Sequence, residues 1–167
     1  MTGVHIRLSP EADLAALTEI YNEQVENGVA TFDTEVKTLE ERREWFLSHQ
    51  EGKYPLISAV TNDQVLGWGS LSPFHPRPAY HPTTEFSVYV HKSYRGKGVG
   101  DMLLADLLDR ARRFGFHSVI GCITSTNTAS LKLVAKHGFG QVGYFREVGM
   151  KFNTWLDVVI VQLLLGK

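Results

Sequence analysis

The residues from Ser87 to Gly100, S-V-Y-V-H-K-S-Y-R-G-K-G-V-G, have the types and spacings best suited to chemistry in this chain. A short apolar stretch leads into a turn in which glycines alternate with basic residues, and an amphipathic helix follows at once. Glycines let the backbone approach a ligand closely, and the first amides of a helix have no intrahelical acceptor. The helix dipole adds partial positive charge at the same place. We therefore predict that this turn binds a diphosphate.

Two common phosphate-binding patterns do not fit the turn. The pattern G-x-G-x-x-G would need a glycine at Asp101, and G-x-x-x-x-G-K-[ST] is absent. What remains is R-x-x-G-x-G, which is separated by four residues from the strand end V-Y-V and resembles the acetyl-CoA pyrophosphate loop of the GNAT superfamily of N-acetyltransferases. The resemblance implies that the pyrophosphate is held by Arg95, Gly96, Lys97, Gly98, Val99, Gly100 and Asp101. An ordinary glycine-rich strand-to-helix turn is the alternative.

Composition narrows the class of protein. A chain of 167 residues fits one domain, residues 1–167, and 43% hydrophobic residues suffice for a core. The net charge of −1 argues against a nucleic-acid partner. No signal peptide is visible, and the longest apolar stretch near the C-terminus, 158–165, is far shorter than the about 18 residues of a membrane span, so we expect no membrane partner. The single cysteine, Cys122, fits a cytoplasmic location, and its apolar neighbours predict a buried structural thiol.

Hydrophobic periodicity predicts alternating strands and helices. We expect helices that begin near residue 10 and at 39, 101 and 128, and that end at 27, 49, 114 and 137. We expect strands over 4–8, 57–61, 65–72, 84–90, 119–124, 143–146 and 155–165. Between 73 and 83, four prolines make a stiff loop. This order predicts an α/β fold with a mixed sheet and helices on its faces.

Eight segments resemble one branch of the GNAT superfamily, the phosphinothricin and methionine sulfoximine N-acetyltransferases. They are I-Y-N (20–22), A-T-F (30–32), P-R-P-A-Y (76–80), E-F-S-V-Y-V (85–90), R-G-K-G-V-G (95–100), N-T-A-S (127–130), H-G-F (137–139) and K-F-x-x-W-x-D (151–157). The resemblance implies a mostly antiparallel mixed sheet flanked by helices. It also implies acetyl transfer from acetyl-CoA to the α-amine of a small amino-acid analogue, such as methionine sulfoximine, methionine sulfone or phosphinothricin. A homodimer is common in the family, and the apolar C-terminal strand would support one.

Glu85 is the candidate general base, because an α-ammonium group cannot attack a thioester until it loses a proton. Strand alternation places Glu85 on one face with Ser87 and Tyr89. In the resembling family a glutamate at this position is the base, acting directly or through water. An ordinary glutamate, with a pKa of about 4.3, is a poor base, so burial would have to raise its pKa. A solvated glutamate at a strand end is the alternative.

The resemblance also implies how acetyl-CoA is bound. The strand would diverge from its neighbour at Val88, Tyr89 and Val90, so that pantetheine binds their main-chain groups like an added strand. One amide would polarise the acetyl carbonyl. Asn127 would contact the pantetheine arm, although its place before a helix also suits an N-cap.

The expected acceptor site combines the proline-rich loop with the start of the Glu85 strand. The resemblance assigns acceptor binding to His75, Pro76, Arg77, Glu85, Phe86 and Ser87. A guanidinium at Arg77 can bind a carboxylate in bidentate fashion, but a surface arginine is the simpler interpretation. Tyr21, Phe32 and Trp68 are as well suited to the wall of such a pocket as to the core.

Other functions remain open at this point. The seven histidines form no metal-binding pattern, so we predict no metal. Acetylation of protein N-termini or polyamines is a second enzymatic possibility. A non-catalytic acyl-CoA-binding module is a third, and it would need no carboxylate at Glu85.

Overall fold

The computed structural model describes residues 3–49 and 52–166, and it contains the elements expected from the sequence in the expected order. The strands are β1 (His5–Leu8), β2 (Leu56–Thr61), β3 (Gln64–Pro73), β4 (Thr83–Val90), β5 (Ser118–Thr124), β6 (Gly140–Lys151) and β7 (Thr154–Leu164). The helices are α1 (Leu14–Asn27), α2 (Leu39–Leu47), α3 (Val99–Arg113) and α4 (Thr128–Lys136). No helix in these two described ranges is long and apolar enough to cross a bilayer.

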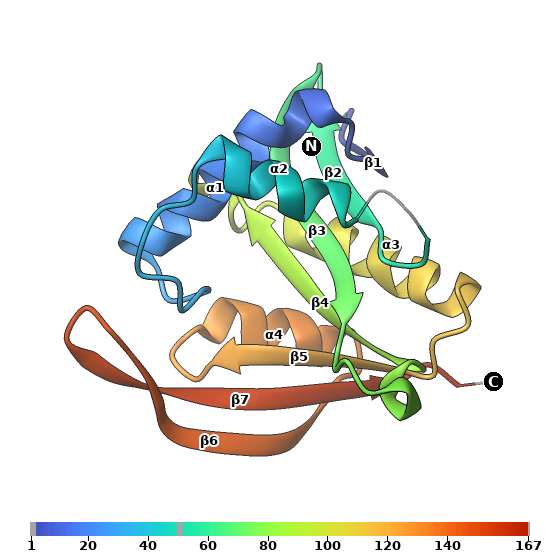
Figure 1. Ribbon diagram of the computed structural model, residues 1–167, viewed down its shortest axis with the longest axis vertical. Coiled ribbons are helices and arrows are strands. Elements are labelled where there is room, and N and C mark those ends of the chain that lie inside the picture. Colours follow the sequence, from blue (N-terminus) through green and yellow to red (C-terminus); the bar gives the residue numbers. More distant parts are fainter. Residues whose placement is uncertain (1–2, 50–51, 167) are drawn as a thin grey trace.

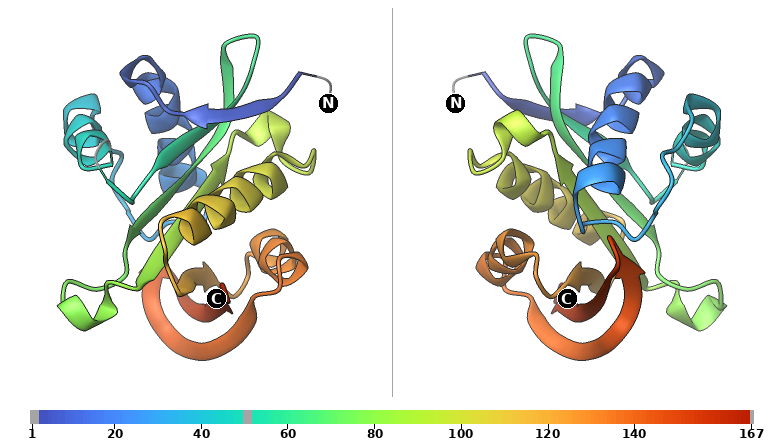
Figure 2. Two further views of the ribbon diagram at one scale, coloured as in Figure 1. Left: turned by 90° about the vertical axis from the view of Figure 1, so that its right-hand side faces the viewer. Right: turned by 90° about the vertical axis from the view of Figure 1, so that its left-hand side faces the viewer.

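The seven strands form one sheet in the order β1-β2-β3-β4-β5-β7-β6. Only β4 and β5 pair in parallel, so the sheet is mixed and mostly antiparallel, as the family resemblance implies. Helices α1 and α2 cover one face of the sheet, and α3 and α4 lie on the other (Figures 1 and 2). The larger core cluster includes Leu66, Leu103, Leu107 and Val119, between the sheet and α3. A smaller cluster around Trp68 packs under α1 and α2.

Strands β4 and β5 diverge soon after they meet. Their register covers only Thr83 to Glu85 on β4, opposite residues 118–120 on β5. Beyond that point the two strands separate (Figure 1), while β3 stays paired with β4 as far as Val90. The β5-facing edge of residues 86–90 is therefore free of strand pairing, which is the divergence that the family resemblance implies.

Strand β6 is much longer than the four residues expected. It covers Gly140–Lys151 and is interrupted between Phe145 and Gly149, where the register shifts and Glu147 has a φ of 49°. Most of its side chains are exposed, including Val142 and Val148. The strand therefore lacks the alternation of buried and exposed residues from which a strand is recognised in sequence.

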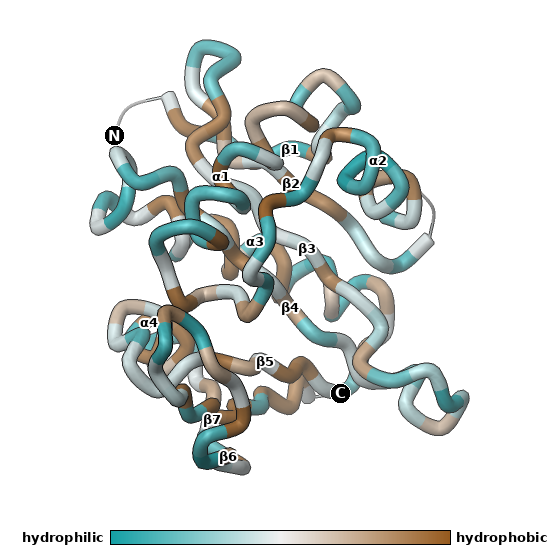
Figure 3. The backbone as a smooth tube through the Cα atoms, turned by 60° about the vertical axis from the view of Figure 1, so that its left-hand side comes forward, coloured by the Kyte–Doolittle hydropathy of each residue, from teal (hydrophilic) through white to brown (hydrophobic). Residues whose placement is uncertain are grey.

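Helix α2 is mainly hydrophilic (Figure 3), so few of its side chains can attach it to the sheet. It begins with a capping box in which Thr38 and Glu41 satisfy each other's backbone amides. Only Arg42 and Phe46 of the helix are buried, and they lie on the same side because they are four residues apart. A buried arginine is unusual, above all on a helix that is otherwise polar.

Candidate functional site

The glycine-rich turn joins β4 to α3 through two residues that need glycine. Gly96 and Gly98 have φ values of 71° and 86°, and Gly98 is the N-cap of α3. The first main-chain bond of the helix runs from the amide of Met102 to the carbonyl of Gly98, at 3.1 Å. The preceding amides have no acceptor within the helix and are arranged as an anion site requires.

The basic residues of the turn are less available to bind an anion than the sequence suggested, because both have contacts within the protein. Arg95 donates from Nε to the carbonyl of Val90 at 3.1 Å, and its guanidinium pairs with Glu23 of α1. Lys97 places its ammonium 5.4 Å from the centre of the Tyr94 ring. The backbone of the turn and Lys97, rather than Arg95, are therefore the groups best placed for an anion.

Asp101 and Asn127 both have structural partners. Asp101 accepts from Lys136 at 2.8 Å and contacts His137 at 2.9 Å, which ties α3 to α4. The hydrogen bond from Lys136 lowers the pKa of Asp101. Asn127 accepts a hydrogen bond from the amide of Ser130 at 3.2 Å and is the N-cap of α4, which is one of the two roles expected for it.

A pocket of about 360 Å³ lies between helices α1 and α2 and strands β3 and β4. Its lining combines aromatic, hydroxyl and charged side chains: Tyr21, Asp33, Lys37, Glu41, Arg42, Trp45, Trp68, Ser70, Ser72, Ser87 and Tyr89. Ser87 and Tyr89 come from the face of β4 that the sequence predicted. Phe86, Val88 and Val90 pack against the larger core cluster on the opposite face. The pocket is large enough for an amino acid and too polar to be a gap in the core.

Glu85 lies at the Ser72 end of this pocket, because the two residues face each other in the β3–β4 register. The side chain is partly buried, and burial raises the pKa of Glu85, although a hydrogen bond with the Cys122 thiol acts in the opposite direction. A raised pKa is what a general base near neutral pH requires.

The prediction that Cys122 is buried is wrong. Its neighbours in β5 are buried, but Cys122 itself is exposed. Helix α1 packs against β3 and β4 rather than β5, so this face of β5 has no helical cover. The thiol group is nevertheless partly shielded from water, and this burial together with the nearby Glu85 raises the pKa of Cys122 to about 11, which keeps the thiol protonated and unsuited to act as a nucleophile.

The proline-rich loop does not reach the pocket. Pro76 and Arg77 are exposed, and neither they nor His75 are among the lining residues. Arg77 begins the short 3-10 helix Pro78–Tyr80, and its amide donates to Nδ1 of His75 at 3.2 Å. The loop immediately precedes β4 and therefore lies near the Glu85 end of the site.

Arg42 is the residue that sequence reasoning missed. Its guanidinium carbon lies 3.6 Å from the centre of the Trp45 ring, 4.7 Å from that of Tyr21 and 5.3 Å from that of Trp68. Only 6% of the residue is exposed, and burial lowers its pKa to about 10. The available signal was helical spacing, since Arg42 precedes the inward-facing Trp45 by three residues.

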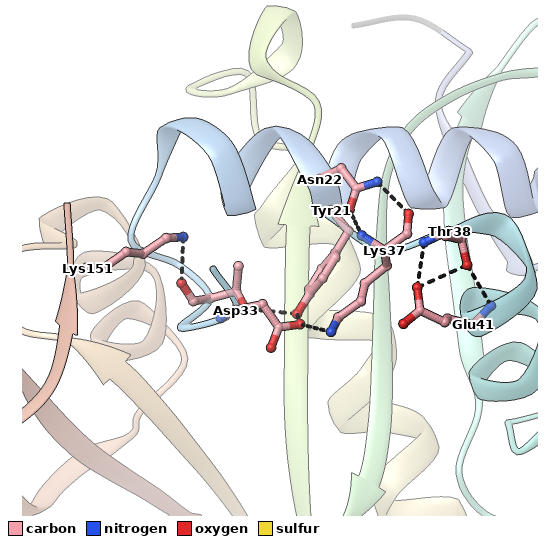
Figure 4. A network of polar contacts seen from close by, with 8 residues as sticks. Tyr21, Asn22, Asp33, Lys37, Thr38, Glu41 and Lys151 are labelled. Atoms are coloured by element: carbon pink, nitrogen blue, oxygen red, sulfur yellow. Dashed lines mark hydrogen bonds and ion pairs between the residues drawn. The ribbon is translucent and has the colours of Figure 1, made fainter. Parts of the chain in front are cut away.

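The connection between α1 and α2 is held against the pocket by polar contacts (Figure 4). Tyr21 donates to Asp33 at 2.6 Å, and the side chain of Asn22 makes two 2.9 Å bonds with the main chain of Lys37. Lys151 of β6 donates to the carbonyl of Thr31 at 3.0 Å. This network fixes Asp33 and Lys37 at the pocket rim. Phe32 of the same segment is exposed and does not line the pocket, unlike Tyr21 and Trp68.

No group of three or more histidine, cysteine, aspartate or glutamate side chains is arranged to hold a metal ion within residues 3–49 and 52–166. The functional groups that the fold brings together are the free edge of β4, the amides at the start of α3, Glu85 and the polar pocket. Together they suit transfer of a group from a phosphate-bearing carrier to a small amine.

Comparison with known proteins agrees with this geometry. The family model described as an acetyltransferase (GNAT) domain matches residues 6–160. A phosphinothricin N-acetyltransferase from Streptomyces coelicolor is 42% identical over 93% of this chain and 92% of its own length. An L-methionine sulfoximine/L-methionine sulfone acetyltransferase from Salmonella typhimurium is 38% identical over 97% of this chain and 95% of its own length.

Solved structures show the same fold. A GNAT superfamily phosphinothricin acetyltransferase from Sinorhizobium meliloti, crystallised in complex with acetyl-CoA, superposes with a TM-score of 0.95 at 35% identity, over 99% of this chain and 90% of that one. The resemblance inferred from the sequence motifs is therefore confirmed, and this chain belongs to the GNAT acetyltransferase family.

Proposed function

We propose that this protein transfers the acetyl group of acetyl-CoA to the α-amine of a small amino-acid analogue such as phosphinothricin, methionine sulfoximine or methionine sulfone. Such a reaction removes the charge of the amine and would detoxify these compounds. The observation that carries the proposal is the amino-acid-sized polar pocket that opens beside Glu85 and the free edge of β4. The names of the relatives from Streptomyces and Salmonella support the acceptor class.

In the proposed reaction, acetyl-CoA supplies an activated thioester. The main-chain groups of Val88, Tyr89 and Val90 line the gap left by β5 and bind the pantetheine arm, with one amide polarising the acetyl carbonyl. The amides of residues 96–101 bind the pyrophosphate. Glu85 takes a proton from the ammonium group, directly or through water, and the free amine attacks the carbonyl carbon. The tetrahedral intermediate then collapses: the C–S bond breaks, the nitrogen loses its second proton, and that proton ends on the departing thiolate, which gives the amide and free CoA.

The proline-rich loop and the start of β4 complete the proposed acceptor site. Arg77 would bind the α-carboxylate, because its side chain is exposed in the loop that precedes the strand of Glu85. His75, Pro76 and Ser87 would bound the same region. Phe86 would contribute only main-chain groups, since its side chain packs in the core against Phe139 at a ring separation of 5.4 Å.

Replacing Arg77 tests the carboxylate contact. Arg77→Ala is expected to raise the KM for phosphinothricin roughly tenfold or more, because a charge-assisted hydrogen bond is lost. The decarboxylated amine of the same length should be affected little. Steady-state kinetics with both acceptors decides the question, and equal losses on the two would remove Arg77 from the site.

The function itself is tested by measuring CoA release by the purified protein with five acceptors: phosphinothricin, methionine sulfoximine, methionine sulfone, spermidine and a peptide with a free N-terminus. Saturable turnover on the first three alone supports the proposal. Turnover on the peptide or spermidine alone would replace the acceptor class. Binding of acetyl-CoA without any turnover would favour the non-catalytic acyl-CoA-binding module.

We further propose that residues 1–167 act as one catalytic domain, in the cytoplasm, and as a homodimer. The family match over residues 6–160 supports the first point. The single cysteine is compatible with a reducing compartment. Exposed apolar side chains on β6 and the adjoining turn, including Phe145, Met150 and Phe152, support the third, because monomers rarely expose such a patch.

A further inference from the structure

The guanidinium of Arg42 is buried in the pocket without a hydrogen-bonding partner for two of its nitrogens. Within the described part of the chain, Nε and Nη2 have no solvent exposure and no acceptor. Aromatic rings surround the group, with Trp45 the nearest. Stacking on rings offsets part of the cost of burying a charge, but it supplies no acceptors for the N–H groups in the guanidinium plane. Arg42 nevertheless lines the pocket, so a ligand that enters it can supply the acceptor that the described part of the protein does not.

The carboxylates of the pocket do not neutralise Arg42. Asp33 accepts from Tyr21 at 2.6 Å and lies 3.4 Å from the ammonium of Lys37. Glu41 accepts from the amide of Thr38 at 2.7 Å in the capping box at the start of α2. Both acidic side chains that line the pocket thus form their hydrogen bonds with other groups, although the charge of Asp33 still favours the charged form of Arg42.

Arg42 and Glu85 lie toward opposite ends of the pocket. Arg42 contacts Trp68, which pairs with Tyr89, whereas Glu85 pairs with Ser72. Tyr89 is four residues from Glu85, and a strand rises about 3.3 Å per residue, so the backbone positions differ by about 13 Å. The side chains of the two strands and of α2 fill part of this distance. An acceptor with its amine at Glu85 would therefore extend its side chain toward Arg42.

The α-carboxylate of an amino acid is attached to the same carbon as the amine and must stay near it. The group that reaches the inner end is then the far end of the side chain. Three serines, Ser70, Ser72 and Ser87, line the pocket between the two ends. A guanidinium there matches a phosphorus or sulfur group that carries two oxygens or an oxygen and a nitrogen, since both arrangements accept two parallel hydrogen bonds.

We infer that Arg42 binds the side-chain oxygens of the acceptor, as in a phosphinate or a sulfone, and thereby selects acceptors with an oxygen-bearing phosphorus or sulfur group at the end of the side chain. This inference rests on the proposed function. It also gives a role to a buried arginine whose Nε and Nη2 have no partner in the described residues, at a position where an apolar residue of similar length would cost less to bury.

The test compares Arg42→Met with wild type on phosphinothricin, methionine sulfone and L-methionine, which lacks the terminal oxygens. Steady-state kinetics gives KM, and calorimetry gives the affinity of each acceptor independently of turnover. We expect the KM and Kd of the first two to rise roughly tenfold to a hundredfold, as for the loss of hydrogen bonds to a charged group. Those of L-methionine should change by less than about threefold, and the KM for acetyl-CoA should stay constant.

Two further variants separate binding from folding. Arg43→Met changes the adjacent exposed arginine, which pairs with Glu11, and should leave all acceptors unaffected. Arg42→Lys keeps the charge without the planar donors and should recover only part of the affinity. The thermal midpoint of Arg42→Met should equal or exceed that of wild type, because a buried unpaired charge is removed. A purely structural arginine would instead give a lower midpoint and equal losses on all three acceptors.

Equal losses on L-methionine, or unchanged affinities throughout, would overturn the assignment. The proposed function fails separately, if the wild-type protein acetylates none of these compounds. In that case calorimetry with phosphinothricin on wild type and Arg42→Met still decides the role of Arg42, and absence of binding to wild type would overturn it as well.

Discussion

Two side chains in and beside the pocket, Glu85 and Arg42, depart from their ordinary pKa values for the same reason. Burial disfavours the charged form of each, so the pKa of Glu85 rises and that of Arg42 falls to about 10. The consequences differ. Arg42 remains charged at neutral pH, as a binding group for oxygens must, whereas Glu85 moves toward the range in which a carboxylate exchanges protons efficiently.

Glu85→Gln should lower kcat/KM at neutral pH by tenfold or more, because a positioned general base typically contributes 10² to 10⁴ in rate. In the wild-type protein, activity should fall on the acidic side with an apparent pKa above that of an ordinary glutamate, since only ionised Glu85 accepts a proton. A pH–rate profile of both proteins measures this. Equal rates for the two proteins across the range would exclude Glu85 as the base.

The same substitution should also increase stability at neutral pH. A carboxyl whose pKa is raised by folding favours the folded state while it is protonated and loses that contribution as the pH rises through the folded-state pKa. Ionised Glu85 therefore lowers the stability of the folded state at neutral pH, and a glutamine, which has no charge, would not. The midpoint of Glu85→Gln should exceed that of wild type at pH 7 and match it near pH 4. A constant difference at both pH values would contradict this linkage.

At the scale of elements, the pocket depends on a contact between distant segments. Lys151 of β6 is 4% exposed and donates to the carbonyls of Gln24 and Thr31, at 2.9 and 3.0 Å. This one ammonium group joins the last turn of α1 and the segment before Asp33 to the edge strand of the sheet, and Figure 4 shows the second of these contacts. The position of Asp33 at the rim of the pocket thus depends in part on Lys151, a residue far away in the sequence.

Lys151→Met should destabilise the fold by about 1–3 kcal/mol, because two carbonyls lose their donor. It should raise the KM for the acceptor more than that for acetyl-CoA, since the loosened segment lines the acceptor pocket. Urea denaturation and kinetics measure the two effects. Lys132→Met, at an exposed position of α4, is the matched control and should change neither. A stable variant with normal kinetics would show that the tether has no role.

The element order was predictable because each strand and helix of the core has hydrophobic residues at the spacing typical of its type and turn-forming residues at its ends. The Asn62-Asp63 turn of the β2–β3 hairpin is one such case, with φ values of 45° and 61°. The length of β6 was not predictable, because exposed strands have no alternation to detect. The exposure of Cys122 and the unpartnered state of Arg42 depend on which parts of the sheet the helices cover, and that is a tertiary property.

At the scale of the whole molecule, the exposed side chains of β6 and the adjoining turn predict self-association. Analytical ultracentrifugation should give the mass of a dimer, and Phe145→Glu should shift it to the monomer, because a charge would be buried in the contact. Phe114→Glu, at the end of α3, is the control for an exposed aromatic elsewhere and should remain dimeric. A wild-type protein that sediments as a monomer would contradict the proposed homodimer.

The brief pairing of β4 with β5 has a consequence for stability. Three register pairs are the strand contacts that join the four-stranded half of the sheet, β1 to β4, to the three-stranded half, β5 to β7. Main-chain pairing between the two halves is therefore confined to this short stretch, and the larger core cluster of side chains joins them elsewhere. A ligand that fills the gap as an extra strand would add main-chain hydrogen bonds between the two halves, so binding of acetyl-CoA there should stabilise the whole fold against unfolding.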